Sequence, residues 1–593
     1  MEKIAKRYQE ALILALIISI IVSVRIIYLL QFQSSPLALI TPSGLDTAFN
    51  HRLAIQLLGG ESSRDFLFSS FYSYFLASIY RIFGINIEAA RIIQMMLGII
   101  SCILVYLVTK ELFGKSVAKL ALCLQGLYSL FIFQEGILIS TTLGIFLSLI
   151  LTFWLMYIQK KSFVLGFYIA GLILGVLCKT LNVSLPLILL LSLWIMRLEK
   201  GLRLKLRSLF IFFLGVLTTL AIFILPNFSI LKESLPIPAH SGINFYIGNN
   251  PEADGTFWPP LNMHSSQLGL LKDSQLIAEK NLGRPLNNKE INWFWFKKGF
   301  AYIASHPYAY LKLTLRKFLI FINGYEPQDI EDFYFAKKFI PLLRFPFISF
   351  YFISALGILG WVVCIRKPEA SVIKLFILGY GISNILYFVT SRYRLPAVPY
   401  FIILASYGLF WLTKRLSAGN LNRIIWLICL LAFLFFLTNI RIFKHDFSYA
   451  FYNLSVKYID TDNVSKALGS AQEAIRINPH IAPAYFNLGI ISYRQGKIKE
   501  ATDNFLKTLE LNPNYFEAHY NLGFIYEEAG DPEKAIKYYL SSLKINPQDE
   551  QVYFNLGCAY LKTGQQDLAK QAFGQAMRLN PRLIPQVKEI LSP

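Results

Sequence analysis

Asp46 is the residue of this sequence whose position best suits chemistry at a membrane surface. It follows the almost wholly apolar segment 11–31 after a short loop. A carboxylate held at a membrane surface, beside hydrophobic helices, is placed to act on a substrate that a lipid carries. Many surface loops carry an aspartate with no chemical role, so Asp46 indicates an enzyme only if other residues converge on it.

Apolar segments long enough to cross a bilayer dominate the chain up to about residue 440. The 593 residues are 55% hydrophobic with a mean hydropathy of +0.48, which is too apolar for a soluble protein of this length. About 20 helical residues cross roughly 30 Å of hydrocarbon. The sequence predicts eleven spans, at 11–31, 89–109, 117–134, 137–158, 163–179, 182–197, 208–226, 344–364, 371–389, 396–413 and 424–440. The first is interpreted as a retained helix, because it is long, contains Arg25 and lacks a small-residue cleavage site.

The formal net charge of +21 belongs to this apolar part of the chain. From residue 447 to the end there are 15 Lys+Arg and 15 Asp+Glu, so the tail is neutral and nucleic-acid binding is not indicated. The excess cations cluster in alternate loops, at 110–119, 160–161, 197–207, 366–367 and 414–423. This positive-inside bias predicts a multi-pass protein of the cell (inner) membrane with a cytoplasmic N-terminus and an extracytoplasmic C-terminus.

Residues 310–323 could be counted as a twelfth span, which would move the later basic loops to the outside. Lys312, Arg316 and Lys317 would be costly in lipid. The segment is therefore predicted to be an amphipathic helix at the outer surface.

Two long segments between spans, 32–88 and 227–343, are predicted to form the outer surface. The second is far longer than a connector needs. Its stretch 242–255 mixes turn-forming residues with aromatic ones and includes Asn249, Asn250 and Asp254. Such a loop suits sugar binding or lipid contact, or it packs on the membrane part as ordinary structure.

The cysteines and histidines give no sign of a metal site. No Cys-x-x-Cys pair occurs among the six cysteines, and the seven histidines lack ligand spacing. The sequence predicts no particular cofactor and leaves a divalent metal as an open alternative.

The tail repeats itself every 34 residues. Asn-Pro recurs at 478–479, 512–513, 546–547 and 580–581, and small residues recur where two helices would cross closely. This is the tetratricopeptide pattern of two antiparallel helices per repeat. The sequence therefore predicts an all-α protein with two domains: a membrane domain at 1–445, and four repeats with a capping segment at 446–593. Repeat arrays of this kind form binding surfaces, so a protein partner is expected.

The membrane part resembles GT-C-type glycosyltransferases that use polyprenyl-phosphate sugars, such as the protein O-mannosyltransferases and the lipid A aminoarabinose transferases. The resemblance covers about 1–440 in five pieces, at 45–52, 89–114, 248–255, 323–326 and 391–396. A proline-containing step that the family often has near Phe71 and Tyr72 is missing. The resemblance implies a polyprenyl-phosphate sugar donor, an extracytoplasmic acceptor (protein, lipid or glycan) and contact with membrane lipid.

The resemblance also implies roles for individual residues. Asp46 would be the general base that takes a proton from the acceptor. Arg392 and Arg394 would bind the lipid phosphate, because arginine matches phosphate with two parallel hydrogen bonds. Lys179 is a second candidate, since all three cations lie at outer ends of spans, where the charge bias predicts few; the alternative is contact with anionic lipid headgroups.

Five supporting residues complete the prediction. Glu135 could be the second acid that the family often has, although Thr141 stands where an acid is common. Glu326 could hold Arg392 or Arg394 in place or be an ordinary surface acid. Asn249, Asn250 and Asp254 could support the site from the outer loop.

Three other functions fit parts of the sequence. An O-antigen-type ligase or polymerase would use a lipid-diphosphate donor, but Asp46 and residues 392–396 favour the first interpretation. A transporter would place charges at mid-membrane, whereas the unusual charges here lie at the outer ends of spans. A non-catalytic scaffold presenting the repeats would need one span rather than eleven.

Overall fold

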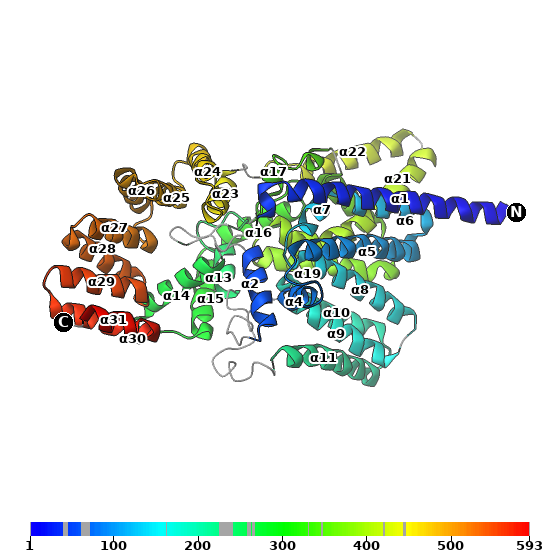
Figure 1. Cartoon of the computed structure of the whole chain (residues 1–593). Helices are drawn as coiled ribbons and strands as arrows, with labels where there is room; N and C mark the ends of the chain where they lie inside the picture. The colour runs from blue at the N-terminus through cyan, green and yellow to red at the C-terminus, as the bar shows by residue number, and fades with distance from the viewer. Residues whose placement is uncertain are drawn as a thin grey trace.

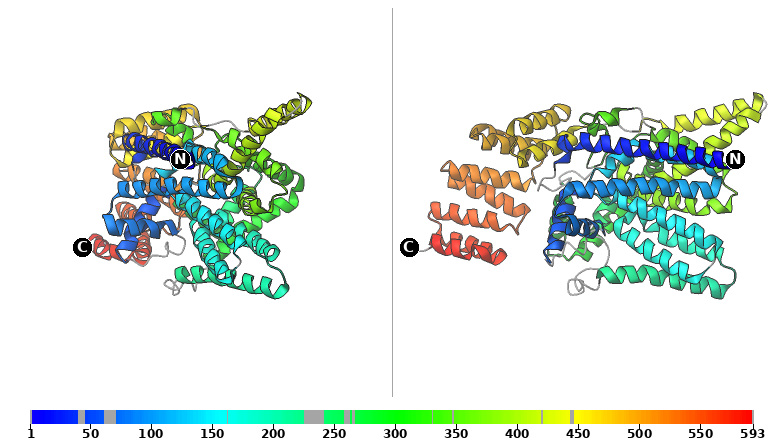
Figure 2. Two further views of the ribbon diagram at one scale, coloured as in Figure 1. Left: turned by 90° about the vertical axis from the view of Figure 1, so that its right-hand side faces the viewer. Right: turned by 45° about the vertical axis from the view of Figure 1, so that its right-hand side comes forward.

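The computed structural model describes residues 2–39, 46–60, 71–161, 163–224, 241–257, 263, 267–329, 331–345, 348–418, 421–442 and 446–591. Every regular element in these ranges is a helix, so the described chain is all-α as predicted. A bundle of long helices forms one end and a curved stack of short helix pairs forms the other (Figure 1). Shorter helices lie between the two, and the N-terminus lies at the end of the bundle farthest from the stack (Figure 2).

The long helices are those that the apolar segments predict. They are α1 (Glu2–Gln33), α5 (Ile87–Phe113), α6 (Lys115–Gly126), α7 (Ser129–Glu135), α8 (Thr141–Lys160), α9 (Val164–Thr180), α10 (Pro186–Leu198), α11 (Leu202–Ile224), α18 (Phe350–Val363), α19 (Ser371–Leu386), α21 (Val398–Ala418) and α22 (Leu421–Thr438). Within the described ranges, six helices are long and apolar enough to cross a membrane, or seven if α6 and α7, bent by 53°, form one span. Four more apolar helices, α9, α10 with the turn before it, α18 and α22, are shorter. Each predicted span contains one of these helices, but the count of eleven stays a prediction.

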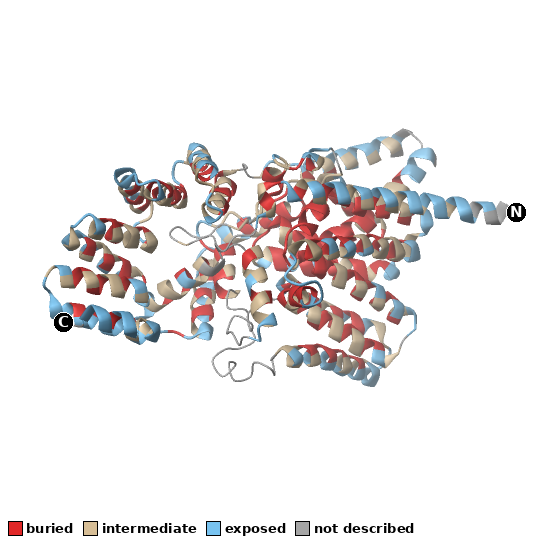
Figure 3. Cartoon of the chain, in the orientation of Figure 1, coloured by how far each residue is buried: buried red, intermediate tan, exposed pale blue. Residues whose placement is uncertain are grey.

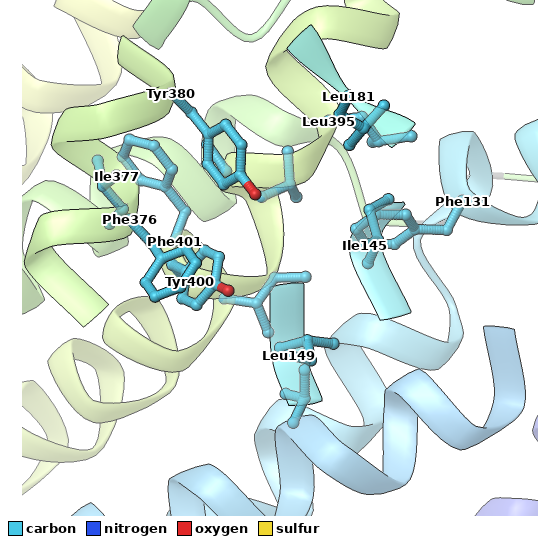
Figure 4. Packing of buried hydrophobic residues seen from close by; sticks show 14 of the residues in the cluster. Phe131, Ile145, Leu149, Leu181, Phe376, Ile377, Tyr380, Leu395, Tyr400 and Phe401 are labelled. Carbon is cyan, nitrogen blue, oxygen red and sulfur yellow. The ribbon is translucent and has the colours of Figure 1, made fainter. Parts of the chain in front are cut away.

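Apolar packing and a few hydroxyl groups hold the bundle together. The Tyr400 hydroxyl of α21 lies 2.6 Å from the Ser148 hydroxyl of α8, and Tyr380 of α19 donates to the same oxygen at 2.9 Å. Figure 4 shows both tyrosines among the apolar side chains of this core. Buried side chains concentrate along the middle of the bundle, whereas α22 and much of α1 are exposed (Figure 3). Interhelical hydrogen bonds of this kind fix helix pairs where the hydrophobic effect cannot.

The two predicted outer segments fold into short helices next to the bundle. They are α2 (Asp46–Leu58), α4 (Phe71–Phe83), α13 (Ser241–Gly248), α14 (Gln267–Leu282), α15 (Asn288–Ser305), α16 (Pro307–Ile322) and α17 (Phe333–Ala336), with α20 (Ser391–Arg394) just before α21. Helix α16 covers the segment that was predicted to be amphipathic. Its Lys317 is completely buried, and its Arg316 donates to the Ile442 carbonyl at 3.2 Å.

The tail forms the predicted helix pairs. They are α23 (Ser448–Asp460) with α24 (Val464–Ile477), α25 (Ala482–Arg494) with α26 (Ile498–Leu511), α27 (Phe516–Glu528) with α28 (Pro532–Ile545), and α29 (Glu550–Lys562) with α30 (Gln566–Leu579). Each second helix ends immediately before an Asn-Pro pair. A Cβ added at Gly489 would lie 2.5 Å from the Phe505 ring, so the helices of that pair cross too closely for a side chain there. The last helix, α31 (Ile584–Leu591), covers the end of the stack.

Candidate active site

Asp46 and Arg392 meet between α2 and α20. Asp46 is the first residue of α2, and Arg392 lies in the single turn of α20, whose first residues are capped by the Thr390 hydroxyl. The Nη1 atom of Arg392 donates to the Asp46 Oδ2 atom at 2.6 Å. The Arg392 side chain is 15% exposed and the Asp46 side chain 17% exposed, so solvent reaches both. The structure thus joins the predicted base to one of the predicted phosphate ligands.

A second carboxylate, Asp329, holds the other edge of the same guanidinium. Its Oδ2 atom lies 3.3 Å from the Arg392 Nε atom, and its side chain is 7% exposed. Asp329 is not among the site residues that the sequence predicts, which include only Glu326 from this acidic segment. A signal was present: four acids stand within 326–332, in a part of the chain where cations are in excess. Asp329 belongs to that acidic segment, and so does Asp332, whose pKa burial raises to about 6.

Arg394 occupies a different environment from Arg392. It is completely buried, forms an ion pair with Glu326, and lies over the Phe350 ring at 4.1 Å. Its guanidinium also donates to three backbone carbonyls, those of Ile320, Asn323 and Tyr325. Of the alternatives for Glu326, the structure therefore places it against Arg394, where it also accepts from the Tyr128 hydroxyl. This cluster fixes the segment that leads from α16 to Asp329.

The predicted outer loop braces the segment before α20. The Val389 amide donates to the Gly255 carbonyl at 2.9 Å, and a Cβ at Gly248 would lie 1.8 Å from the Tyr387 carbonyl oxygen. Asn249 and Asn250 are buried, and their amide groups donate to nearby backbone carbonyls. Asp254 accepts from the amide and hydroxyl of Thr256 within a turn. These three residues therefore shape the loop from inside.

Lys317 of α16 is tied to this loop. Its Nζ atom donates to the Asn249 Oδ1 atom at 3.0 Å, and its side chain is completely buried. Burial lowers the pKa of Lys317 to about 7, because a charged ammonium is costly away from water. In the sequence alone, Lys317 indicates only that this segment does not span the membrane.

Glu135 and Lys179 both stand at the ends of bundle helices. Glu135 ends α7 and accepts two hydrogen bonds from Arg25 of α1, at 2.7 and 2.8 Å, with both side chains buried. This pair explains how Arg25 is accommodated in an apolar helix. Lys179 is a partly buried residue in the last turn of α9, a helix that packs on α8 and α11.

A cleft opens beside the first turn of α2. It is lined by residues from six parts of the chain: Phe32, Leu37, Leu39, Thr47, Ala48, Arg91, Phe133, Gly136, Ile137, Glu331 and Lys457. Apolar side chains form much of its wall, and the charged groups are Arg91, Glu331 and Lys457. A mainly apolar wall with a few charged groups thus lies beside the residues that follow Asp46. Within the described ranges, no group of three or more His, Cys, Asp or Glu side chains is arranged to hold a metal ion.

Comparison with known proteins finds a family match within the membrane part. Residues 70–229, from the start of α4 past the end of α11, match the dolichyl-phosphate-mannose-protein mannosyltransferase family. The chain contains a domain of this family. The mannosyltransferase-family domain makes it a glycosyltransferase that depends on a polyprenyl-phosphate sugar, and its apolar helices make it a multi-pass membrane protein. Asp46 and Arg392 lie outside the matched range.

The same comparison identifies the tail as tetratricopeptide repeats. Residues 516–549, 491–530 and 538–571 match three families of this repeat. No curated protein sequence matches the chain.

Several solved structures resemble part of the chain. A crystal structure of MamA has 26% identity, covers 23% of this chain and 81% of its own, and gives a TM-score of 0.22. MamA from Desulfovibrio magneticus RS-1 has 25% identity, with 23% and 77% coverage and a TM-score of 0.22. The pilF protein of Pseudomonas aeruginosa has 24% identity, with 23% and 61% coverage and the same TM-score.

Proposed function

We propose that this protein transfers a sugar from a polyprenyl-phosphate donor to an acceptor on the outer side of the membrane, with Asp46 as general base. The observation that carries the proposal is the Asp46–Arg392 pair, which joins an acid and a cation 346 residues apart in the chain. Both are partly exposed at one end of the helix bundle, and the cleft opens beside them. Arg394 is less suitable than Arg392 as the phosphate ligand, because its side chain is completely buried.

The proposed reaction needs one base and one cation. Asp46 accepts the proton of the acceptor hydroxyl or amine while that oxygen or nitrogen bonds to the anomeric carbon. The bond from this carbon to the phosphate oxygen breaks, and the lipid phosphate leaves with the bonding electrons. Arg392 stabilises the charge that develops on the phosphate, since a guanidinium can form two parallel hydrogen bonds with it.

The Asp46–Arg392 contact suggests how the base is held before substrate arrives. Without a donor, Arg392 neutralises Asp46 on one edge and Asp329 on the other. A donor phosphate competes for the edge that faces Asp46, and Asp329 keeps the guanidinium in place. Asp46 is then released to accept a proton. Glu326 and Arg394 act as positioning residues, because their buried pair fixes the backbone that leads to Asp329.

We also propose that the repeats lie outside the cytoplasm and recruit the acceptor or a protein partner. The alternating basic loops support this topology, and the N-terminus and the repeats lie at opposite ends of the molecule (Figure 1). A curved repeat surface near the catalytic end raises the local concentration of whatever it binds. Lys179 stays a second candidate for contact with the donor phosphate.

Incubating the purified protein with radiolabelled polyprenyl-phosphate sugars tests the proposal. The panel contains the mannosyl form and other hexosyl and pentosyl forms, each offered with serine- and threonine-containing peptides and with native membranes as acceptor sources. Transfer from at least one donor by the wild type, and its loss in Asp46→Asn, is expected. Equal transfer by Asp46→Asn and by Asp503→Asn, a control at an exposed position of the repeats, would contradict the proposed base.

A further inference from the structure

The first repeat helix is built into the core of the membrane part. Ala450 and Leu454 of α23 are buried in the same apolar cluster as the long helices. The Phe451 ring meets Phe335 of α17 edge-on, with ring centroids 4.8 Å apart. The Nζ atom of Lys338 lies 4.6 Å from the centroids of the Phe447 and Phe451 rings. Helix α23 therefore supports the outer segment rather than only joining the repeats to the membrane.

Lys457 extends this support towards the site. It is 4% exposed, and its Nζ atom lies 3.0 Å from the Glu331 Oε1 atom and 3.4 Å from the Leu37 carbonyl oxygen. Glu331 is two residues after Asp329, which holds Arg392. Leu37 belongs to the short turn Pro36–Ala38 after α1, on the stretch of chain that leads towards Asp46. One buried ammonium thus contacts both a residue nine positions before Asp46 and a residue two positions after Asp329.

The cleft shows that these contacts lie at the site. Lys457, Glu331 and Leu37 line the same cleft as Thr47 and Ala48, the residues that follow Asp46. We propose that Lys457 is a positioning residue that sets the placement of Asp46 relative to Asp329 and Arg392. The inference rests on the proposed function, and it assigns the first repeat to the active site and not to recruitment alone.

The expected effect of removing this ammonium follows from geometry. Lys457→Met keeps the length and apolar contacts of the side chain but leaves Glu331 and the Leu37 carbonyl without their buried donor. Misplacing a reacting group by ~1 Å can cost about 10²-fold in rate. Lys457→Met should therefore lower kcat about 10-fold or more, with little change in the KM for the donor. Lys457→Arg restores a cation and should recover most of the rate.

The test compares Lys457→Met and Lys457→Arg with Lys537→Met, a matched change at an exposed lysine of α28. Each full-length variant is assayed with the donor that the wild type uses and a serine- and threonine-containing peptide, or, if peptides accept no sugar, the native-membrane acceptors. A fall in kcat for Lys457→Met alone, with recovery in Lys457→Arg, supports the inference. Wild-type kcat in Lys457→Met overturns it, and so does an equal fall in all three variants.

Loss of folding is separated from loss of positioning by a second change. In Lys457→Met with Glu331→Gln, both charges are removed, so no carboxylate is left without its ammonium partner at position 331. If both residues act through their mutual contact, the double variant loses no more rate than Lys457→Met does. If the rate loss of the double variant equals the product of the losses caused by each change alone, the inference is overturned. Transfer by the wild type and by Lys537→Met establishes the proposed function independently, so a negative result for Lys457 does not count against it.

Discussion

The Arg392 guanidinium bridges Asp46 and Asp329, with nitrogen–oxygen distances of 2.6 and 3.3 Å. Asp46 begins the first helix after α1, whereas Arg392 lies just before α21, so the bridge joins distant parts of the chain. A bridge between two carboxylates keeps the cation fixed while one carboxylate stays partly exposed. The bridge gives Asp46 and Arg392 separate roles that mutation can distinguish.

Arg392→Ala should impair use of the donor more than it impairs folding. The side chain is partly exposed, and its loss removes the cation that meets the developing phosphate charge. Loss of one such electrostatic donor costs about 10²–10³-fold in kcat in other enzymes. Transfer kinetics over a range of donor concentrations measure the effect, with Arg578→Ala on the exposed face of α30 as control. Equal kinetics in the two variants would exclude Arg392 as the phosphate ligand.

Arg394→Met should instead destabilise the protein. Arg394 is completely buried, and the change removes the hydrogen bonds that its guanidinium donates to the Glu326 carboxylate and to three backbone carbonyls. Removing one partner of a buried ion pair typically costs about 3–5 kcal/mol. Thermal unfolding in detergent should show a large drop in Tm for Arg394→Met and a small one for Arg392→Ala. The reverse order would mean that the two arginines have been assigned the wrong roles.

Lys317 should make stability depend on pH above neutrality. Its folded-state pKa, about 7, is below the usual value near 10.4. Between these values the unfolded chain holds more protons, so the free energy of unfolding rises with pH, by at most about 1.4 kcal/mol per pH unit. From pH 7 to about pH 10, the Tm of the wild type should rise relative to the Tm of Lys317→Met. Below pH 6, the difference between the two Tm values should be constant. Parallel Tm curves would contradict the burial of an ionisable ammonium.

Truncating the repeat array should distinguish the support that α23 gives the active site from the recruitment of acceptor by the later repeats. A chain ending after residue 480 keeps α23 and α24, and so keeps the contacts of Phe451 and Lys457 with the membrane part. It should fold and transfer sugar to a small peptide acceptor, while transfer to the acceptors of native membranes falls. A chain ending at residue 446 lacks α23, and it should lose transfer to the peptide as well as transfer to the acceptors of native membranes. Equal activity of the two truncated chains towards the peptide would show that α23 gives the site no support.

The sequence predicted the elements better than it predicted the directions of side chains. Repeats follow from a period of 34 residues, and apolar helices follow from composition, so both could be read locally. Arg392 and Arg394 look equivalent in sequence, but residues two apart on a helical turn face different sides. Arg392 therefore reaches Asp46, whereas Arg394 points into the core.

Contacts between distant segments could not be predicted. Glu135 was expected near the chemistry, but its partner is Arg25, and the pairing depends on how α1 packs on α7. Lys457 belongs to a repeat whose pattern describes only the helix pair itself, so its contacts with Glu331 and Leu37 carry no local signal. Asp329 had one, since acids gather at 326–332, but its partner came from a segment more than 60 residues later.

The transfer rate of Asp46→Asn is the most direct test of Asp46 as the general base. The change keeps the size and polarity of the side chain but removes its ability to accept a proton, and a positioned base contributes about 10²–10⁴-fold. With the donor that the wild type uses, kcat should fall by a factor in that range, while Tm and donor binding stay close to wild type. A folded Asp46→Asn variant that transfers sugar at the wild-type rate would contradict the account.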